Sequence, residues 1–171
     1  MDSRERSDVT LERALSLLRT EGTGVAGLYE EADRIRKVHM GDEVHIRGII
    51  EFSNNCGNDC LYCGIRRSNE KVKRYAMPVR EILKAAREMA GTAQTTVVLQ
   101  SGESHCLSDR KLGEVIRRIK EETGLSITVS VGNRRYDVYR YWKECGMDRY
   151  LLRFETSDPE LFARLRPGSG L

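Results

Sequence analysis

Short apolar segments alternate with amphipathic ones along most of this chain, and that alternation restricts the folds open to it. The predicted strands are residues 46–52, 95–100, 125–131 and 149–154. Between them, apolar residues recur at helical spacing, which predicts helices over residues 78–90, 108–122 and 136–145, and a last helix from about Asp158. Strands and helices that alternate over short connections form parallel sheets with right-handed crossovers. The sequence therefore predicts an α/β fold.

Boundary residues agree with these helices. Ser108 and Asp158 are good N-caps, and Gly124 lies where a helix should stop. The first forty residues follow a different pattern, since Leu11, Leu15 and their neighbours form a helical apolar stripe with no strand between. We therefore expect residues 1–44 to be an N-terminal helical segment and residues 45–171 to be the α/β core.

The core contains too few units to close a barrel. Four strand–helix units are predicted in a chain of 171 residues, whereas a complete eightfold parallel barrel takes about 250 residues. We expect the chain to be the N-terminal half of a TIM-type (β/α) barrel, ending before the remaining strands. The alternative is a small open α/β sheet that is complete in itself.

Composition excludes several classes of function. The formal net charge is +3, which is too small and too evenly spread to indicate a nucleic-acid partner. No apolar run approaches the roughly 20 residues that span a bilayer, and the first residues lack signal-peptide character. We expect a cytoplasmic protein that binds neither membrane nor nucleic acid.

Three of the five cysteines lie close together, directly after the first predicted strand. Cys56, Cys60 and Cys63 have the spacing C-x3-C-x2-C. Three thiolates can hold three irons of a [4Fe-4S] cluster and leave the fourth iron open to the amino and carboxylate groups of S-adenosylmethionine. Tyr62 suits a loop that lies against the adenine ring. A structural zinc site would need a fourth ligand from His105 or Cys106, and a disulfide is the other alternative.

This loop resembles the motif of the radical S-adenosylmethionine (radical SAM) superfamily, C-x3-C-x-aromatic-C. The likeness extends to other parts of the chain, from about residue 11 to the end, and its main segments are residues 51–54, 62–67, 99–103 and 150–156. Together these segments resemble the [FeFe]-hydrogenase maturases of the biotin synthase-like branch. Biotin synthase itself fits less well, because it has an Asn-Leu-Asp-Thr-type segment where this chain reads Leu-Arg-Phe-Glu-Thr.

The resemblance implies an enzyme that cleaves S-adenosylmethionine reductively to give a 5′-deoxyadenosyl radical. It further implies a small substrate, an iron-bound complex derived from cysteine, during assembly of the hydrogenase active site. Its partners would be an electron donor such as ferredoxin or flavodoxin and the other hydrogenase maturation proteins. A methylornithine or biotin synthase-like activity is the alternative within this chemistry. A structural zinc or electron-transfer iron–sulfur module is the alternative outside it.

Two pairs of residues at strand ends are further candidates for the site. After the second strand, Gly102 permits close backbone approach, and Glu103 could accept a hydrogen bond from an ammonium group. Ser101-Gly102-Glu103 resembles the Gly-Gly-Glu segment of the superfamily, which implies binding of the methionine part of the cofactor. At the end of the fourth strand, the resemblance assigns Arg153 to a ligand carboxylate and Glu155 to the ribose hydroxyls. The alternative for that second pair is a mutual ion pair.

Thr128 and Ser130 share one face of the third predicted strand, because side chains alternate with a period of two. If that face is the barrel interior, their hydroxyls could hold a substrate carboxylate, although threonine also simply suits strands. The family resemblance is what favours them as substrate-binding residues. Asn133 departs from the maturases, which tend to have an acidic residue after that glycine.

Overall fold

The computed structural model describes residues 9–168, and its contacts divide the chain between Val44 and His45. The first unit contains helices α1 (Leu11–Leu18) and α2 (Gly24–Met40), and Thr10 Oγ1 caps α1 by accepting from the Arg13 N–H at 3.2 Å. No side chain of either helix is buried. Two helices alone are too few to enclose a core, so the apolar stripe through Leu11 and Leu15 is not buried within this unit.

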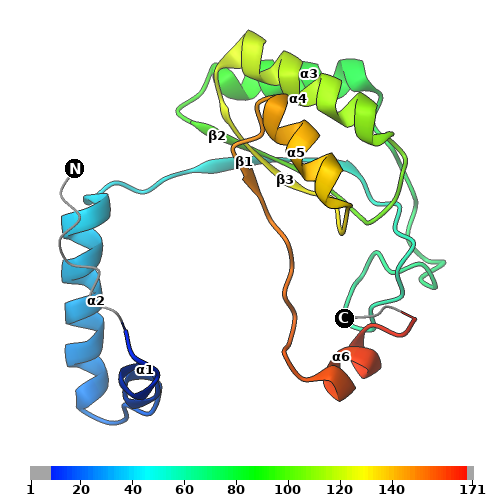
Figure 1. The fold of residues 1–171 in the computed structure, drawn as a ribbon. Coiled ribbons are helices and arrows are strands. Elements are labelled where there is room, and N and C mark those ends of the chain that lie inside the picture. The colour runs from blue at the N-terminus through cyan, green and yellow to red at the C-terminus, as the bar shows by residue number, and fades with distance from the viewer. Residues whose placement is uncertain (1–8, 169–171) are drawn as a thin grey trace. The chain divides into compact units, whose positions relative to one another are not determined.

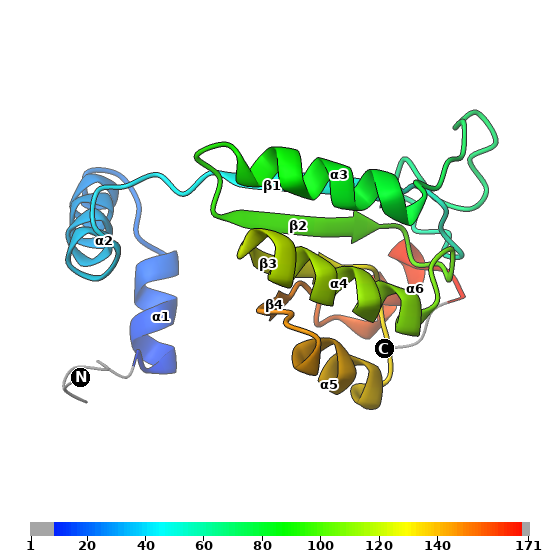
Figure 2. The same cartoon turned by 90° about the horizontal axis from the view of Figure 1, so that it is seen from above.

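The second unit (Figure 1) is a four-stranded parallel sheet with the strands in sequence order, β1-β2-β3-β4, as Figure 2 shows. The strands are β1 (Arg47–Ser53), β2 (Thr96–Ser101), β3 (Ser126–Ser130) and β4 (Arg149–Tyr150). The helices are α3 (Val79–Ala90), α4 (Asp109–Thr123), α5 (Tyr136–Glu144) and α6 (Pro159–Leu165). Ser108 and Asp158 cap α4 and α6 through their side chains, and Gly124 ends α4 with φ 68°. The predicted parallel α/β alternation is confirmed.

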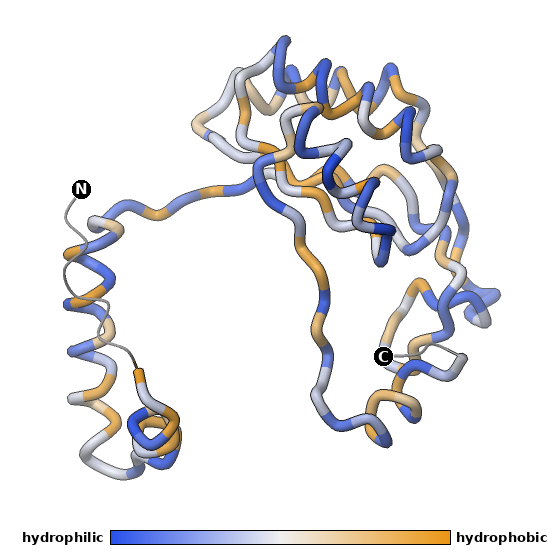
Figure 3. Tube along the Cα trace, in the orientation of Figure 1, coloured by the Kyte–Doolittle hydropathy of each residue, from blue (hydrophilic) through white to orange (hydrophobic). Residues whose placement is uncertain are grey.

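Helices α3, α4 and α5 cover one face of the sheet (Figures 1 and 2). The strand side chains on this face are apolar and buried against the helices: Ile50, Phe52, Val97, Leu99, Ile127 and Val129. Figure 3 shows the same pattern as orange segments along the strands and recurring orange positions on the helices. Trp142 of α5 is fully buried and donates its indole N–H to Asp109 O at 2.8 Å, which joins α5 to the start of α4.

The opposite face of the sheet is more polar, and no described helix of this unit covers it (Figure 1). Glu51, Gln100 and Ser130 lie side by side there, because the register pairs Glu51 with Gln100 and Gln100 with Ser130. Gln100 Nε2 donates to Glu51 Oε1 at 2.8 Å. Thr128 lies on this face one step earlier along β3, as its alternation with the buried Ile127 and Val129 requires.

The fourth strand is shorter than predicted. It ends at Tyr150, and residues 151–154 continue without strand pairing although they were expected to belong to it. The Leu151 N–H still donates to Val129 O at 2.9 Å, but β3 itself ends at Ser130. Because no described strand lies on the far side of β4, nothing in this part of the chain supplies further ladder bonds. None of the helices within residues 9–168 is long and apolar enough to span a membrane.

Candidate active site

The cysteine loop follows β1 and lines a cavity of about 170 Å³ at the carboxyl ends of the strands. Cys56, Cys60 and Cys63 are free, partly buried, and all lie in the cavity wall. A short turn between the second and third of them is closed by the Cys63 N–H, which donates to Cys60 O at 3.0 Å. The carboxyl ends of parallel strands are where such folds place their chemistry, and the predicted position of the loop is confirmed.

Arg74 binds backbone carbonyls at both ends of the cysteine loop. Its Nη1 donates to Asn54 O at 2.6 Å and to Ile65 O at 2.8 Å, so one nitrogen joins the residues on either side of the three cysteines. Its Nη2 donates to Arg66 O at 2.6 Å and to Asn69 O at 3.4 Å. A guanidinium offers five donors in a fixed planar fork, which suits several carbonyls converging from different directions. This one side chain therefore fixes the entry and the exit of the loop.

Gly102 and Glu103 lie against the cysteine loop at the end of β2. The Gly57 N–H donates to Glu103 O at 2.8 Å. A Cβ atom on Gly102 would come within 2.4 Å of Asn55 O and 2.8 Å of Cys56 Cβ, so only glycine fits. The two segments that the sequence assigned to the cluster and to the methionine part of the cofactor thus touch through their backbones.

The Glu103 carboxylate is held from two sides. Its Oε2 accepts from the Asn133 N–H at 3.1 Å and lies 3.9 Å from Arg166 Nη2. A Cβ on Gly132 would collide with the Glu103 side chain, and Gly132 has φ 82°, so glycine is needed there for both reasons. The carboxylate lines the cavity while its orientation is fixed by the loop after β3.

Tyr62 and Glu155 meet across the same cavity. Partial burial, together with a hydrogen bond to the Glu155 carboxylate and the nearness of Cys60, raises the pKa of the Tyr62 phenol. Glu155 has φ 62°, in the left-handed region that a residue with a side chain rarely adopts. Strain of this kind concentrates at functional sites, and here it turns the segment after β4 at the carboxylate that the sequence analysis selected.

Of the three residues expected to bind substrate, Ser130 and Arg153 line the cavity, whereas Thr128 does not. Thr128 is 7% exposed, and its Oγ1 has no hydrogen-bond partner among the described residues. Within residues 9–168, Arg153 has no ion-pair partner, so the alternative of a mutual pair with Glu155 is not what the structure contains. Arg153 is exposed and follows β4 in the extended segment.

His105 and Cys106 are both exposed and lie outside the cavity that the three loop cysteines line. All five cysteines are free, so the disulfide alternative does not describe this structure. Within residues 9–168, no three His, Cys, Asp or Glu side chains converge in a way that could hold a single metal ion. Thiolates of a cubic cluster each bind a different iron, so they surround a larger volume than the ligands of one ion do.

The residues present fit an iron–sulfur cluster with S-adenosylmethionine beside it. Three free thiols face one cavity, which matches a donor set that leaves one iron without a protein ligand. The close approach at Gly102 leaves that wall without a side chain. Glu103 and Glu155 supply carboxylates to the same cavity. These groups suit a cationic amine and the hydroxyls of a sugar.

Sequence reasoning missed several residues that shape this site. Arg166, at the end of α6, lines the cavity with its side chain 11% exposed, and its guanidinium carbon lies 5.3 Å from the centre of the Phe162 ring. Arg74 was missed because its acceptors are backbone carbonyls, which no residue type in the sequence marks. Nothing in the sequence indicated that Leu165 contacts the cysteine loop, where its carbonyl oxygen accepts from the Leu61 N–H at 2.9 Å.

Comparison with known families and proteins agrees with this site. The model of the radical SAM superfamily matches residues 50–170. The chain therefore belongs to the radical SAM superfamily, and membership implies a [4Fe-4S] cluster and S-adenosylmethionine.

Comparison with individual proteins shows which members of the superfamily this chain is similar to. The chain is 44% identical to the "[FeFe] hydrogenase maturase subunit HydE" of Thermotoga maritima, over 98% of this chain and 47% of that protein. It is 31% identical to the 3-methylornithine synthase of Methanosarcina barkeri, over 95% of this chain and 46% of that protein. The crystal structure of methylornithine synthase (PylB) superposes with a TM-score of 0.83 at 30% identity, covering 95% of this chain and 49% of that one.

The chain spans about half the length of the curated relatives it matches. The match to a solved radical SAM structure confirms that the sheet and its helices correspond to the start of a TIM-type barrel. The resemblance to the superfamily and to the hydrogenase maturases, inferred from the cysteine loop and its neighbouring segments, is confirmed as well.

Proposed function

We propose that this chain is the N-terminal part of a radical SAM enzyme that acts in maturation of [FeFe]-hydrogenase. The observation that carries the proposal is the shared cavity, in which the three cysteines of the loop lie with Glu103 and Glu155. The 44% identity to a hydrogenase maturase subunit supports the maturation role. We further propose that residues 1–44 form a helical segment separate from the radical SAM core of residues 45–171, a division that the contact pattern supports.

The bound cluster and cofactor supply the electron transfer that cleaves a carbon–sulfur bond of S-adenosylmethionine, giving methionine and the 5′-deoxyadenosyl radical. Cys56, Cys60 and Cys63 provide the thiolates. Gly102 leaves room for the cofactor beside the loop, and Glu103 accepts from its amino group. These contacts orient the cofactor, and the partly buried cavity wall limits the access of water.

The other end of the cofactor lies with Tyr62 and Glu155. Glu155 accepts from the ribose hydroxyls, and it lines the same cavity as Tyr62. The ring of Tyr62 is half-exposed and lies in the cavity wall, which suits a contact with adenine. A hydrogen bond from a ribose hydroxyl to the Glu155 carboxylate should contribute about 1.5–3 kcal/mol to cofactor binding, the range for hydrogen bonds to charged groups.

The substrate is a small molecule, and we propose an iron complex derived from cysteine. Ser130 and Arg153 line the cavity on the side of β3 and β4, and Arg153 has a free guanidinium among the described residues with which to bind a carboxylate. Thr128 lies two residues before Ser130 on the same face of β3, and we propose it as the third substrate-binding residue. A ferredoxin or flavodoxin would supply the electron, and the other hydrogenase maturation proteins would receive the product.

Methylornithine synthesis is the second candidate, because a methylornithine synthase structure superposes with a TM-score of 0.83. The identity is lower than with the maturase subunit, 31% against 44%. Deletion of the gene separates the two functions. We expect loss of [FeFe]-hydrogenase activity with no change in 3-methylornithine, measured by mass spectrometry. Loss of 3-methylornithine with normal hydrogenase activity would instead establish the second candidate.

A further inference from the structure

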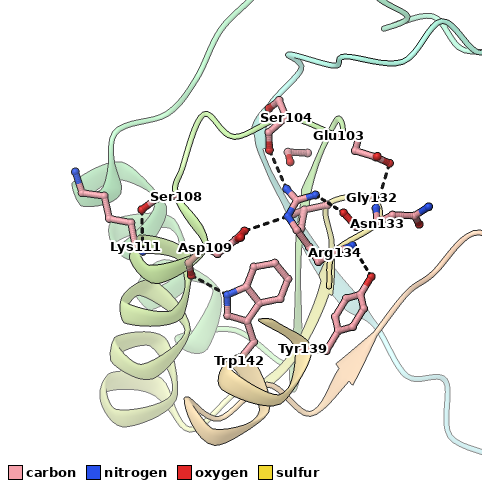
Figure 4. Close-up of polar contacts among 12 residues, drawn as sticks. Glu103, Ser104, Ser108, Asp109, Lys111, Gly132, Asn133, Arg134, Tyr139 and Trp142 are labelled. Carbon is pink, nitrogen blue, oxygen red and sulfur yellow. Dashed lines mark hydrogen bonds and ion pairs between the residues drawn. The ribbon is translucent and has the colours of Figure 1, made fainter. Parts of the chain in front are cut away.

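Arg134 is the most deeply buried charged side chain near the candidate site for which an ion pair is found, with 5% of the side chain exposed. It follows β3 by four residues and pairs with Asp109, the first residue of α4, where Nε donates to Oδ1 at 3.0 Å. It does not line the cavity. Figure 4 shows the guanidinium between the start of α4 and two loops at the carboxyl ends of the strands.

These loops come from neighbouring strands. Arg134 Nη2 donates to Ser104 O at 2.8 Å, in the loop after β2, and Nη1 donates to Asn133 O at 2.7 Å, in the loop after β3. The backbone of Arg134 is fixed as well, because its N–H donates to the Tyr139 hydroxyl at 2.8 Å. One side chain therefore sets the distance between the two loops.

Glu103 lies between these two anchored points. It directly precedes Ser104, and its carboxylate accepts from the Asn133 N–H at 3.1 Å (Figure 4). Arg134 thus binds the backbone carbonyls of both Ser104, the neighbour of Glu103 in the chain, and Asn133, whose N–H binds the carboxylate. Ser104 and Asn133 cannot separate without breaking a hydrogen bond to a buried charge, which costs more than breaking one between neutral groups.

A buried ion pair is by itself weak evidence of stabilisation, because desolvation of both charges offsets their attraction. What this pair does is specify one arrangement of three segments, since the planar fork satisfies acceptors from all of them in one geometry only. In that arrangement Glu103 lines the cavity, its carboxylate accepts from the Asn133 N–H, and its backbone lies against the cysteine loop.

We propose that Arg134 is a positioning residue for cofactor binding, which acts through Glu103 and not by contact with the cofactor. The ligand group concerned is the cationic amine of an amino acid, here that of S-adenosylmethionine, so the inference rests on the proposed function. The Asp109–Arg134 pair keeps the carboxylate where the amine binds. Arg134 donates to no residue of the cysteine loop, which meets this network only where the Gly57 N–H donates to Glu103 O. We therefore expect the iron content to be independent of Arg134.

The first experiment compares Arg134→Gln with the wild type in anaerobically reconstituted protein that carries its cluster. Equilibrium binding of S-adenosylmethionine is measured beside iron per chain. We expect the Kd to rise at least tenfold with the iron content unchanged. Arg134→Lys keeps the charge beside Asp109 and loses the fork, so its Kd should lie between the two. Arg135→Gln is the matched control, because Arg135 is 87% exposed and pairs only with Asp137 among the described residues.

A double-mutant cycle tests the route through Glu103. Glu103→Gln alone should raise the Kd, and adding Arg134→Gln should then change it less than twofold. An equal tenfold effect in both backgrounds, or no effect of Arg134→Gln on the wild type, would overturn the proposal. Loss of iron in Arg134→Gln would overturn it too, since the role would then be structural. If that variant does not fold, Asp109→Asn replaces it, with a Kd increase of about threefold expected. Wild-type protein that holds iron and does not bind S-adenosylmethionine refutes the proposed function instead.

Discussion

Replacing Gly102 with alanine should disrupt the contact between β2 and the cysteine loop. The added methyl group would lie 2.4 Å from Asn55 O, 2.8 Å from Cys56 Cβ and 3.0 Å from the Asn55 carbonyl carbon. Two of these neighbours are backbone atoms, which no change of rotamer can move. The Gly102 N–H also donates to Ser53 O at 3.3 Å, so Gly102 itself is tied to β1. An alanine at this position therefore fits only if the cysteine loop moves.

The cost follows from overpacking. Forcing a methyl group into a filled site costs about 1–3 kcal/mol of the free energy of unfolding. For a chain of this size, each kcal/mol corresponds to roughly 2–4 °C, so the midpoint of thermal unfolding should fall by about 2–12 °C. If the cysteine loop moves and the sheet stays unstrained, the midpoint of thermal unfolding falls less, and the iron retained per chain decreases.

The assay is iron per chain after anaerobic reconstitution, beside a thermal unfolding curve of the same sample. Gly64→Ala is the matched control, because it adds the same methyl group to the cysteine loop at a position with nothing within 4 Å. We expect Gly64→Ala to match the wild type in both measurements. If Gly102→Ala also matches it in both, the close approach that defines this wall of the cavity is not a feature of the protein.

Three further predictions concern single side chains. Glu155→Ala should weaken S-adenosylmethionine binding by about 1–3 kcal/mol and leave the cluster in place, which calorimetry and iron analysis would check; cluster loss would contradict the assigned role. Arg74→Ala should lower the iron retained after gel filtration, because four loop carbonyls lose their donor, whereas Lys73→Ala, exposed beside it, should retain the wild-type content. Thr128→Val should stabilise the fold by about 1 kcal/mol in chemical denaturation, because the buried Oγ1 has no partner; destabilisation would indicate a hydrogen bond that the structure lacks.

Local sequence signals predicted the fold well. Alternation of apolar segments gave the strands and helices, and capping residues such as Ser108 and Asp158 marked where two helices begin. The position of the cysteine loop followed from the same reasoning, because a loop that follows a parallel strand lies at the carboxyl end of the sheet. Strand β4 was predicted too long, because pairing depends on a neighbouring strand and not on the apolar run through Leu151 and Leu152.

The arginines that organise the site could not be predicted in this way. Arg74 contacts Asn54, twenty positions earlier in the chain, and Arg134 contacts Ser104, thirty positions earlier. Both bind backbone carbonyls, which every residue possesses, so nothing in the local pattern marks the partner. The face of Thr128 was predicted correctly from its alternation on β3, but whether its hydroxyl reaches the cavity depends on packing that no period encodes.

The most direct test of the account is the electron paramagnetic resonance spectrum of the reduced protein, recorded with and without S-adenosylmethionine. The account predicts close to one [4Fe-4S] cluster per chain and a spectrum that changes when the cofactor is added. Alanine at Cys56, Cys60 or Cys63 should abolish the signal, whereas Cys145→Ala should preserve it, because Cys145 is buried in the core at the C-terminal end of α5. Stoichiometric zinc and no iron uptake in protein purified without oxygen would contradict the central claim.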